Sequence, residues 1–136
     1  MENKFCFKIF LNSDRLEAIG VVGAVRCFQY NRERGEPLMV EATPRPRTAE
    51  EVWRCVTEAR WRQYQAGGSS SSMMDHYYDK LLHVAKFDPT VVNSSYLVAE
   101  ARRRVQPLVD VCIESGISGE APLESLRKLE SSILQK

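Results

Sequence analysis

Three polar side chains recur along one predicted helix at a spacing that places them on the same face. His76, Lys80 and His83 stand at i, i+4 and i+7, on the side opposite in tendency to apolar residues such as Met74 and Tyr77. Two imidazoles on one face are potential ligands for a transition metal. Seven residues of helix, however, separate them by about 10 Å along the axis, which is too far to hold one ion. The spacing alone therefore predicts a solvated polar face.

A second candidate group stands at the start of another predicted helix. Asp14 follows Ser13, a residue type preferred at helix N-caps, and a carboxylate in the first turn is favoured by the helix dipole. One carboxylate does not hold a divalent ion without further ligands. The residues themselves therefore predict that Asp14 is a helix-terminus acid.

The elements that position these residues are predicted to be helices. Apolar residues recur every three or four positions over residues 14–30, the pattern of one buried helical face. A loop is expected over residues 31–47, which contain three prolines. Thr48 and Glu51 then form a capping-box pattern, which predicts a helix that reaches about Ala66.

The second half of the chain continues the helical pattern. A Gly/Ser segment at 67–72 predicts a flexible link, and a helix is expected over 73–86. A long helix over 95–114 contains Pro107, which predicts a kink. Residues 116–136 are expected to form a linker and an amphipathic tail helix. Since no segment alternates at period two for long enough to be a strand, the predicted fold is all-α, a helical array.

Composition excludes some classes of partner. The 136 residues carry 19 basic and 18 acidic side chains, a net charge of +1, so no global field favours nucleic acid or a membrane surface. The triplet Arg102 to Arg104 is too short a basic stripe for a nucleic-acid site. No stretch approaches the roughly 18 apolar residues of a membrane span. The four cysteines have no metal-site or redox spacing and are expected to be reduced, which favours a cytoplasmic protein.

Three segments together resemble a known family. Asn12–Gly20 is similar to the D-A-D-R-L-E/D-A-I-G segment of the HD-domain phosphohydrolases, in the small single-domain branch, and Asp75–Leu82 is similar to its D-H-F-x-x-K-L-L segment. Ala99–Arg102 resembles the A-x-x-R that opens the last long helix of that family. The resemblance covers residues 8–115, apart from an idiosyncratic stretch at about 40–70.

The resemblance implies an arrangement of domains as well as a fold. It predicts that residues 1–115 form a partial HD-domain-like helical region, similar to the C-terminal half of the family bundle. The linker and tail helix at 116–136 would follow this region. Intact members of the family look like metal-dependent hydrolases of nucleotides or phosphate esters.

The metal site implied by the resemblance is incomplete in this sequence. In the family a divalent cation is held by a His, a His-Asp pair and a last Asp, and Asp14 matches that last ligand. Only thirteen residues precede Asp14 and none is a histidine, while Asn12 replaces a carboxylate of the family motif. We therefore expect a truncated, inactive chain that binds no metal stably.

The resemblance also assigns residues to a phosphate-containing substrate. Lys80 would be a phosphate-binding charge, and His76 a hydrogen-bond donor or acid. Arg15 would lie beside the substrate or form an ordinary ion pair with Glu17. For Arg26 the ion pair is the favoured interpretation, because surface pairs of this kind are common.

Two other hypotheses are compatible with the sequence. The chain could be a non-catalytic helical module that self-associates or docks through apolar faces left exposed at Leu16, Ile19, Gly20 and Gly23. Alternatively, Met1 is not the true start, and an upstream segment with the H…HD ligands would restore the enzyme.

Overall fold

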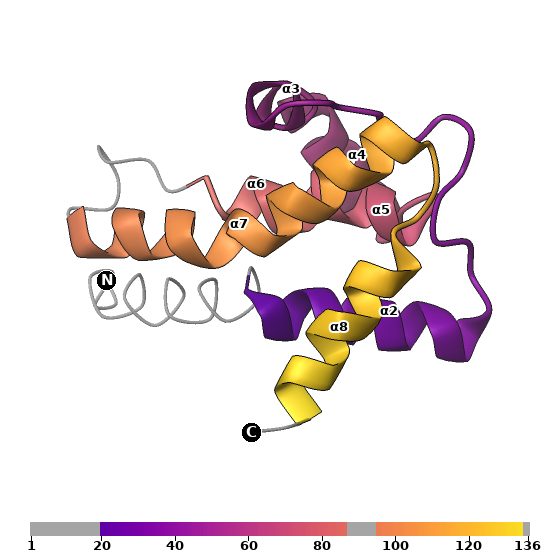
Figure 1. Ribbon diagram of the computed structural model, residues 1–136. Coiled ribbons are helices and arrows are strands. Elements are labelled where there is room, and N and C mark those ends of the chain that lie inside the picture. Colours follow the sequence, from indigo (N-terminus) through magenta and orange to yellow (C-terminus); the bar gives the residue numbers. More distant parts are fainter. Residues whose placement is uncertain (1–19, 87–94, 135–136) are drawn as a thin grey trace, which may run out of the picture.

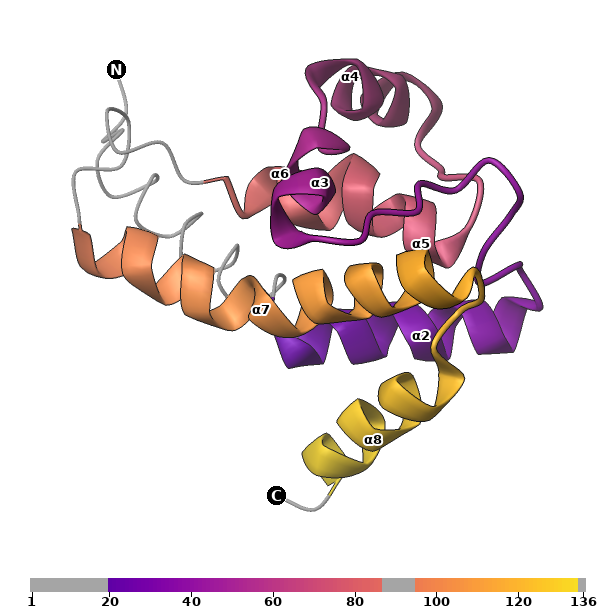
Figure 2. The same ribbon diagram turned by 45° about the horizontal axis from the view of Figure 1, so that its top comes forward.

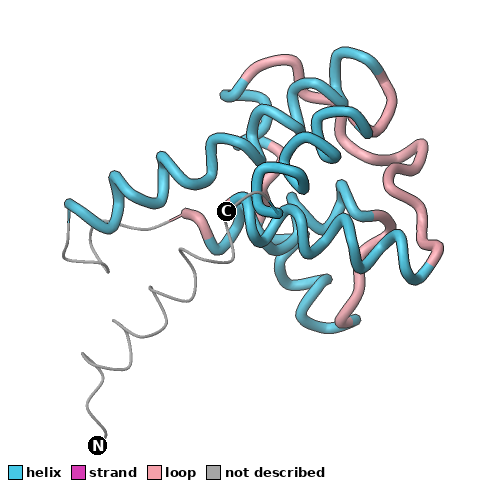
Figure 3. Tube along the Cα trace, turned by 60° about the horizontal axis from the view of Figure 1, so that its bottom comes forward, coloured by secondary structure: helices cyan, strands magenta, loops and turns pink. Residues whose placement is uncertain are grey.

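A computed structural model describes residues 20–86 and 95–134, and within these ranges every regular element is a helix (Figure 1), which confirms the all-α class. In the Cα trace the segments between these helices are loops (Figure 3). The helices are α2 (Val21–Arg34), α3 (Ala49–Arg54), α4 (Glu58–Gly67), α5 (Met73–His76), the π-helical turn η1 (Tyr77–Leu81), α6 (Leu82–Val84), α7 (Ser95–Ser118) and α8 (Leu123–Leu134).

The elements α5, η1 and α6 follow one another without a break, and we call them together the central helix. One of its faces is fully buried and carries Tyr77, Tyr78 and Leu82. Across from it lie buried residues of α7, such as Leu108, and of α2, such as Phe28. Helix α7 runs beside α2, with α3 to α6 gathered on its other side (Figure 2). The core therefore sits between the central helix, α2 and α7.

The loop after α2 begins later than predicted. The helix continues through Arg34 and ends where Gly35 adopts φ 68°, with its N–H donating to the carbonyl of Asn31. A left-handed residue at this position is favourable for glycine, which has no Cβ to clash. The carbonyls of Pro37 and Leu38 then accept from the first amides of the central helix, at 3.1 and 3.0 Å. The loop thereby caps the helix that carries His76 and Lys80.

The prediction of a single helix from Thr48 to Ala66 is wrong, because the structure has two helices, α3 and α4, in this range. The Thr48 hydroxyl accepts from the Glu51 amide at 3.2 Å, as the capping-box pattern predicts, but the Glu51 carboxylate binds the amide of Arg47 instead of that of Thr48. A second N-cap follows at Thr57, whose hydroxyl accepts from the Arg60 amide at 3.2 Å. This cap starts α4 in a new direction.

The long helix α7 extends to Ser118, so the predicted end at Ser115–Gly116 is also wrong. It bends partway along its length, as expected from its interior Pro107 (Figure 1). Gly116 is buried inside this helix, where an added Cβ would overlap the backbone carbonyl of Pro46. The glycine therefore permits close contact between α7 and the loop before α3.

The tail helix α8 packs against α2. Leu126 is buried, and Glu130 accepts from Gln29 at 2.9 Å and pairs with Arg32 at 2.7 Å. The predicted exposed face is not found at Gly20 and Gly23, which are both buried. Leu16 and Ile19 lie outside the described residues. Exposed large apolar side chains occur instead as Val22 and Tyr30 on α2, Tyr96 and Ile117 on α7, and Leu123 on α8.

Candidate functional site

A cleft of about 610 Å³ opens beside the central helix. It brings together His76 and Lys80, the two described residues that the family resemblance assigned to substrate, with Arg26 of α2. Fourteen residues line it: Arg26, Cys27, Tyr30, Asn31, Glu36, Pro37, Tyr64, Gly68, Ser69, Ser70, Ser71, Ser72, His76 and Lys80. Two segments that are fifty residues apart in sequence thus meet in one hollow.

The cleft is lined by two cationic side chains, Lys80 and Arg26. Lys80 places its ammonium 5.9 Å from the ring centre of Tyr64, a cation–π contact. Neither Lys80 nor Arg26 forms a salt bridge within the described parts of the chain. Arg26 is exposed, and Glu17, one acid of the ion pair expected for the arginines of this segment, lies outside the described residues.

His76 lies half-buried between the cations and α4. Its ring meets that of Tyr64 edge to face at 5.3 Å, and its Nδ1 lies 3.4 Å from the Ser70 hydroxyl. Burial lowers the pKa of His76 below 6.5, the neighbouring Lys80 lowers it further, and Asp79 opposes them. The imidazole is therefore neutral near pH 7.

A buried polar network fixes the wall of the cleft behind His76. Arg60 of α4 lies 2.7 Å from Asp79 and 3.4 Å from Asp75, and both acids belong to the central helix. The hydroxyl of Thr43 donates to Asp75 at 2.7 Å. Ser70 donates to Asp79 at 2.8 Å. Because α4 buries none of its own residues, the network and the ring contacts hold it in place.

The serine segment is more than the flexible link that was predicted. Ser72 is buried and caps α5, accepting from the Asp75 amide at 3.1 Å. Its hydroxyl also donates to the Asp75 carboxylate at 2.5 Å, and Ser70 is bonded to Asp79. Sequence reasoning missed these roles, although two acids four residues apart on a largely buried helix indicate that a cation must lie nearby.

The prediction that His83 lies on a solvated polar face does not describe its surroundings. Its ring stacks on Trp61 of α4 with centroids 4.4 Å apart and an interplanar angle of 10°. It does not line the cleft. The π-helical turn at η1 lies between the two histidines, and such turns recur at functional sites.

Cys27 is the thiol of the cleft. Burial raises its pKa to about 11, although the Lys80 charge acts in the opposite direction. It is a free cysteine that stays protonated at neutral pH, and a protonated thiol is a poor nucleophile. Cleft chemistry therefore depends on Arg26, His76 and Lys80.

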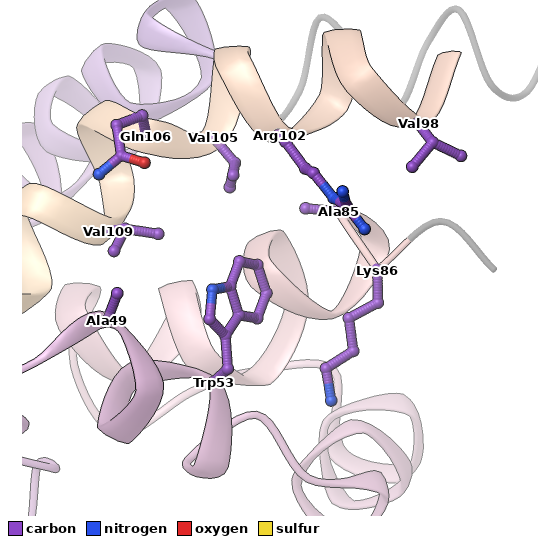
Figure 4. A pocket seen from close by; sticks show the side chains of 9 residues that line it. All are labelled: Ala49, Trp53, Ala85, Lys86, Val98, Arg102, Val105, Gln106 and Val109. Carbon is purple, nitrogen blue, oxygen red and sulfur yellow. The ribbon is translucent and has the colours of Figure 1, made fainter. Parts of the chain in front are cut away.

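A second hollow, which we call the groove, lies between α3, α6 and α7 and measures about 530 Å³. The Trp53 indole rises from α3 toward Val105 and Val109 of α7, and Arg102 reaches from α7 toward Ala85 (Figure 4). Its lysine, Lys86, donates to the carbonyl of Val56 at 2.7 Å. The groove therefore has a largely apolar lining with two exposed cations at its edge, Arg102 and the hydrogen-bonded Lys86.

The predicted residues Asp14 and Arg15 lie outside the described residues. In the part of the chain that the structure covers, no group of three His, Cys, Asp or Glu side chains could hold a metal ion. The acidic pair Asp75 and Asp79 is bonded to Arg60 and hydroxyls. The described donor set thus does not fit a divalent cation. No described helix has the length and hydropathy of a membrane span.

The chain is similar in sequence to a viral protein. The chain is 38% identical over 102 residues to an uncharacterized protein of Acanthamoeba polyphaga mimivirus, a match that covers 75% of this chain. The chain spans 42% of the length of that viral protein. No family model and no solved structure matches the chain.

Proposed function

We propose that the cleft binds the phosphate group of a small molecule and that the chain is related to the HD-domain phosphohydrolases. The observation that carries the proposal is the meeting of Arg26, His76 and Lys80 in one cleft. His76 and Lys80 belong to the Asp75–Leu82 segment, which resembles that family, and Arg26 lies on the helix that follows the resembling Asn12–Gly20 segment.

The chemistry of the three side chains suits a phosphate. The guanidinium of Arg26 and the ammonium of Lys80 supply charge-assisted hydrogen bonds, which are stronger than those between neutral groups. The neutral ring of His76 adds a polar group between them. Ser69 and Ser71 at the mouth of the cleft are further hydroxyl donors.

Metal-dependent turnover is not part of this proposal. In the family the divalent ion activates water and polarises the phosphoryl group. Asp14 alone matches that ligand set, and the described residues do not complete it. We propose that the 136-residue chain binds its ligand without hydrolysing it.

Isothermal titration calorimetry with phenyl phosphate at pH 7.5 tests the proposal. Lys80→Met should weaken binding about tenfold, equal to roughly 1.4 kcal/mol, because it removes a charge-assisted contact. Arg26→Met should weaken it by a smaller factor, since this residue lies exposed at the rim. Arg102→Met, which removes the exposed arginine of the groove, is the matched control and should leave affinity unchanged.

Two outcomes would contradict the proposal. One is absence of saturable binding to the unmodified chain. The other is an equal loss of affinity in Lys80→Met and Arg102→Met, which would show general attraction between the anion and a cationic surface. Cleavage of phenyl phosphate that a chelator abolishes would contradict the absence of turnover.

A further inference from the structure

The hydrogen bonds around Ser70 define where the proton of His76 sits. Arg60 lies 2.7 Å from one oxygen of Asp79, so this group is a carboxylate that only accepts hydrogen bonds. The Ser70 hydroxyl, 2.8 Å from the other oxygen, must then donate its single hydrogen to Asp79. The Ser70 oxygen, 3.4 Å from Nδ1 of His76, can therefore only accept a hydrogen bond from that nitrogen.

The consequence is a defined tautomer of the imidazole. Because Ser70 accepts, Nδ1 of His76 carries the hydrogen, and Nε2 is the nitrogen that can take up a proton. This is the arrangement in which an oriented histidine accepts a proton at one nitrogen while the other donates to a polar partner. Ser70 and Asp79 are therefore positioning residues, since they act on a ligand through His76.

We infer that the cleft takes up one proton when it binds a phosphate group, and that this proton goes to Nε2 of His76 while Ser70 and Asp79 hold Nδ1–H in place. The inference rests on the proposed function. The proton comes from solvent, and no bond other than that N–H is made or broken. The bound dianion and the new imidazolium then form a charge pair beside Lys80.

The surroundings of His76 explain why the proton arrives only with the ligand. Without an anion, burial and Lys80 hold the pKa of His76 below its usual value, so the ring is neutral. A dianion in the cleft reverses the local charge and favours the imidazolium. The charged and titratable groups that face this site are Lys80 and Asp79 on the central helix, Arg60 and Tyr64 on α4, Arg26, Cys27 and Tyr30 on α2, and Glu36 of the loop.

Sulfate is the probe that separates protein protonation from ligand protonation. It stays a dianion between pH 8 and 5.5, whereas a phosphate monoester gains a proton near pH 6. Calorimetric affinity for sulfate should therefore rise as pH falls, by up to about tenfold per pH unit for one linked proton. Titrations in buffers of different ionisation enthalpy should give close to one proton taken up at pH 7.

Variants assign the proton to its site. His76→Gln should abolish both the rise in sulfate affinity and the proton uptake, while His83→Phe, which removes the other titratable ring but keeps an aromatic ring against Trp61, should keep both. Proton uptake that persists in His76→Gln would overturn the inference. Weak anion binding by every form, including the unmodified chain, would instead count against the proposed function.

A readout without ligand tests the positioning role separately. Nitrogen-15 spectra of the free protein at pH 7.5 should show His76 with hydrogen on Nδ1. Ser70→Ala should shift the ring toward the Nε2–H form, and Ser69→Ala should not. Observation of the Nε2–H tautomer in the unmodified protein would overturn the assignment, whether or not an anion binds.

Discussion

The cleft and the groove are similar in size but different in construction. The cleft measures about 610 Å³ and gathers Arg26, His76 and Lys80, whereas the groove measures about 530 Å³ and is floored by Trp53 and valines of α7. Volume alone therefore does not distinguish a binding site from an imperfection of packing. What distinguishes the cleft is that its polar side chains are held in place by bonded partners.

The two hollows also differ in what holds their walls. The groove is bounded by α7, whose buried residues include Leu108 and Val109. The cleft is bounded by α4, which buries no residue and is held by the Arg60 network, by the edge-to-face contact of Tyr64 with His76 and by the stacking of Trp61 on His83. We therefore expect the wall of the cleft to depend on charge and the wall of the groove on apolar burial.

The largest expected effect is on the wall of the cleft. Arg60→Met leaves Asp75 and Asp79 buried without their cation, so it should lower the free energy of unfolding by about 3 kcal/mol. Urea denaturation measures this loss. Arg54→Met, which removes an exposed pair with Glu50, is the control and should cost less than about 0.5 kcal/mol. Equal losses in the two variants would remove the distinction between the walls.

The stability of the groove wall should depend on apolar burial instead of charge. Val105 is 3% exposed, and Val105→Ala removes two buried methyl groups, so stability should fall by about 2 kcal/mol. Affinity for phenyl phosphate, measured at a temperature where the variant is folded, should not change. A loss of affinity comparable to that of Lys80→Met would show that the two hollows are coupled.

The smallest expected effect is a pH dependence of stability that arises from His76 in the cleft. The native pKa of His76 lies below the unfolded value of about 6.5. As pH falls from 6.5 through the native pKa, the unfolded chain binds a proton that the native protein does not, so stability should decrease. Urea midpoints in this window should fall more steeply for the unmodified protein than for His76→Gln. Identical slopes would contradict the environment assigned to His76.

Local patterns in the sequence predicted a large part of this architecture. The capping hydroxyl of Thr48, the helical character of 73–86 and the common face of His76 and Lys80 depend on neighbours within a few residues, which the sequence displays. The all-α class follows from the same local signals.

What sequence reasoning missed depends on contacts between distant segments. The break before Thr57 was hidden because the helical pattern continues through it, and the Val56 carbonyl finds its partner in Lys86, thirty residues away. Gly116 looked like a helix end, but it lies where α7 meets Pro46. The place of Arg26 in the cleft likewise depends on how α2 packs beside the central helix.

The most direct test of the central claim is to map phosphate binding by NMR. Nitrogen-15-labelled protein would be titrated with inorganic phosphate at constant ionic strength, and the amide shifts followed to saturation. The account predicts that the largest shifts fall at Arg26, Ser70, His76 and Lys80, with little change at Trp53. Shifts concentrated around Trp53, or shifts that never saturate, would contradict it.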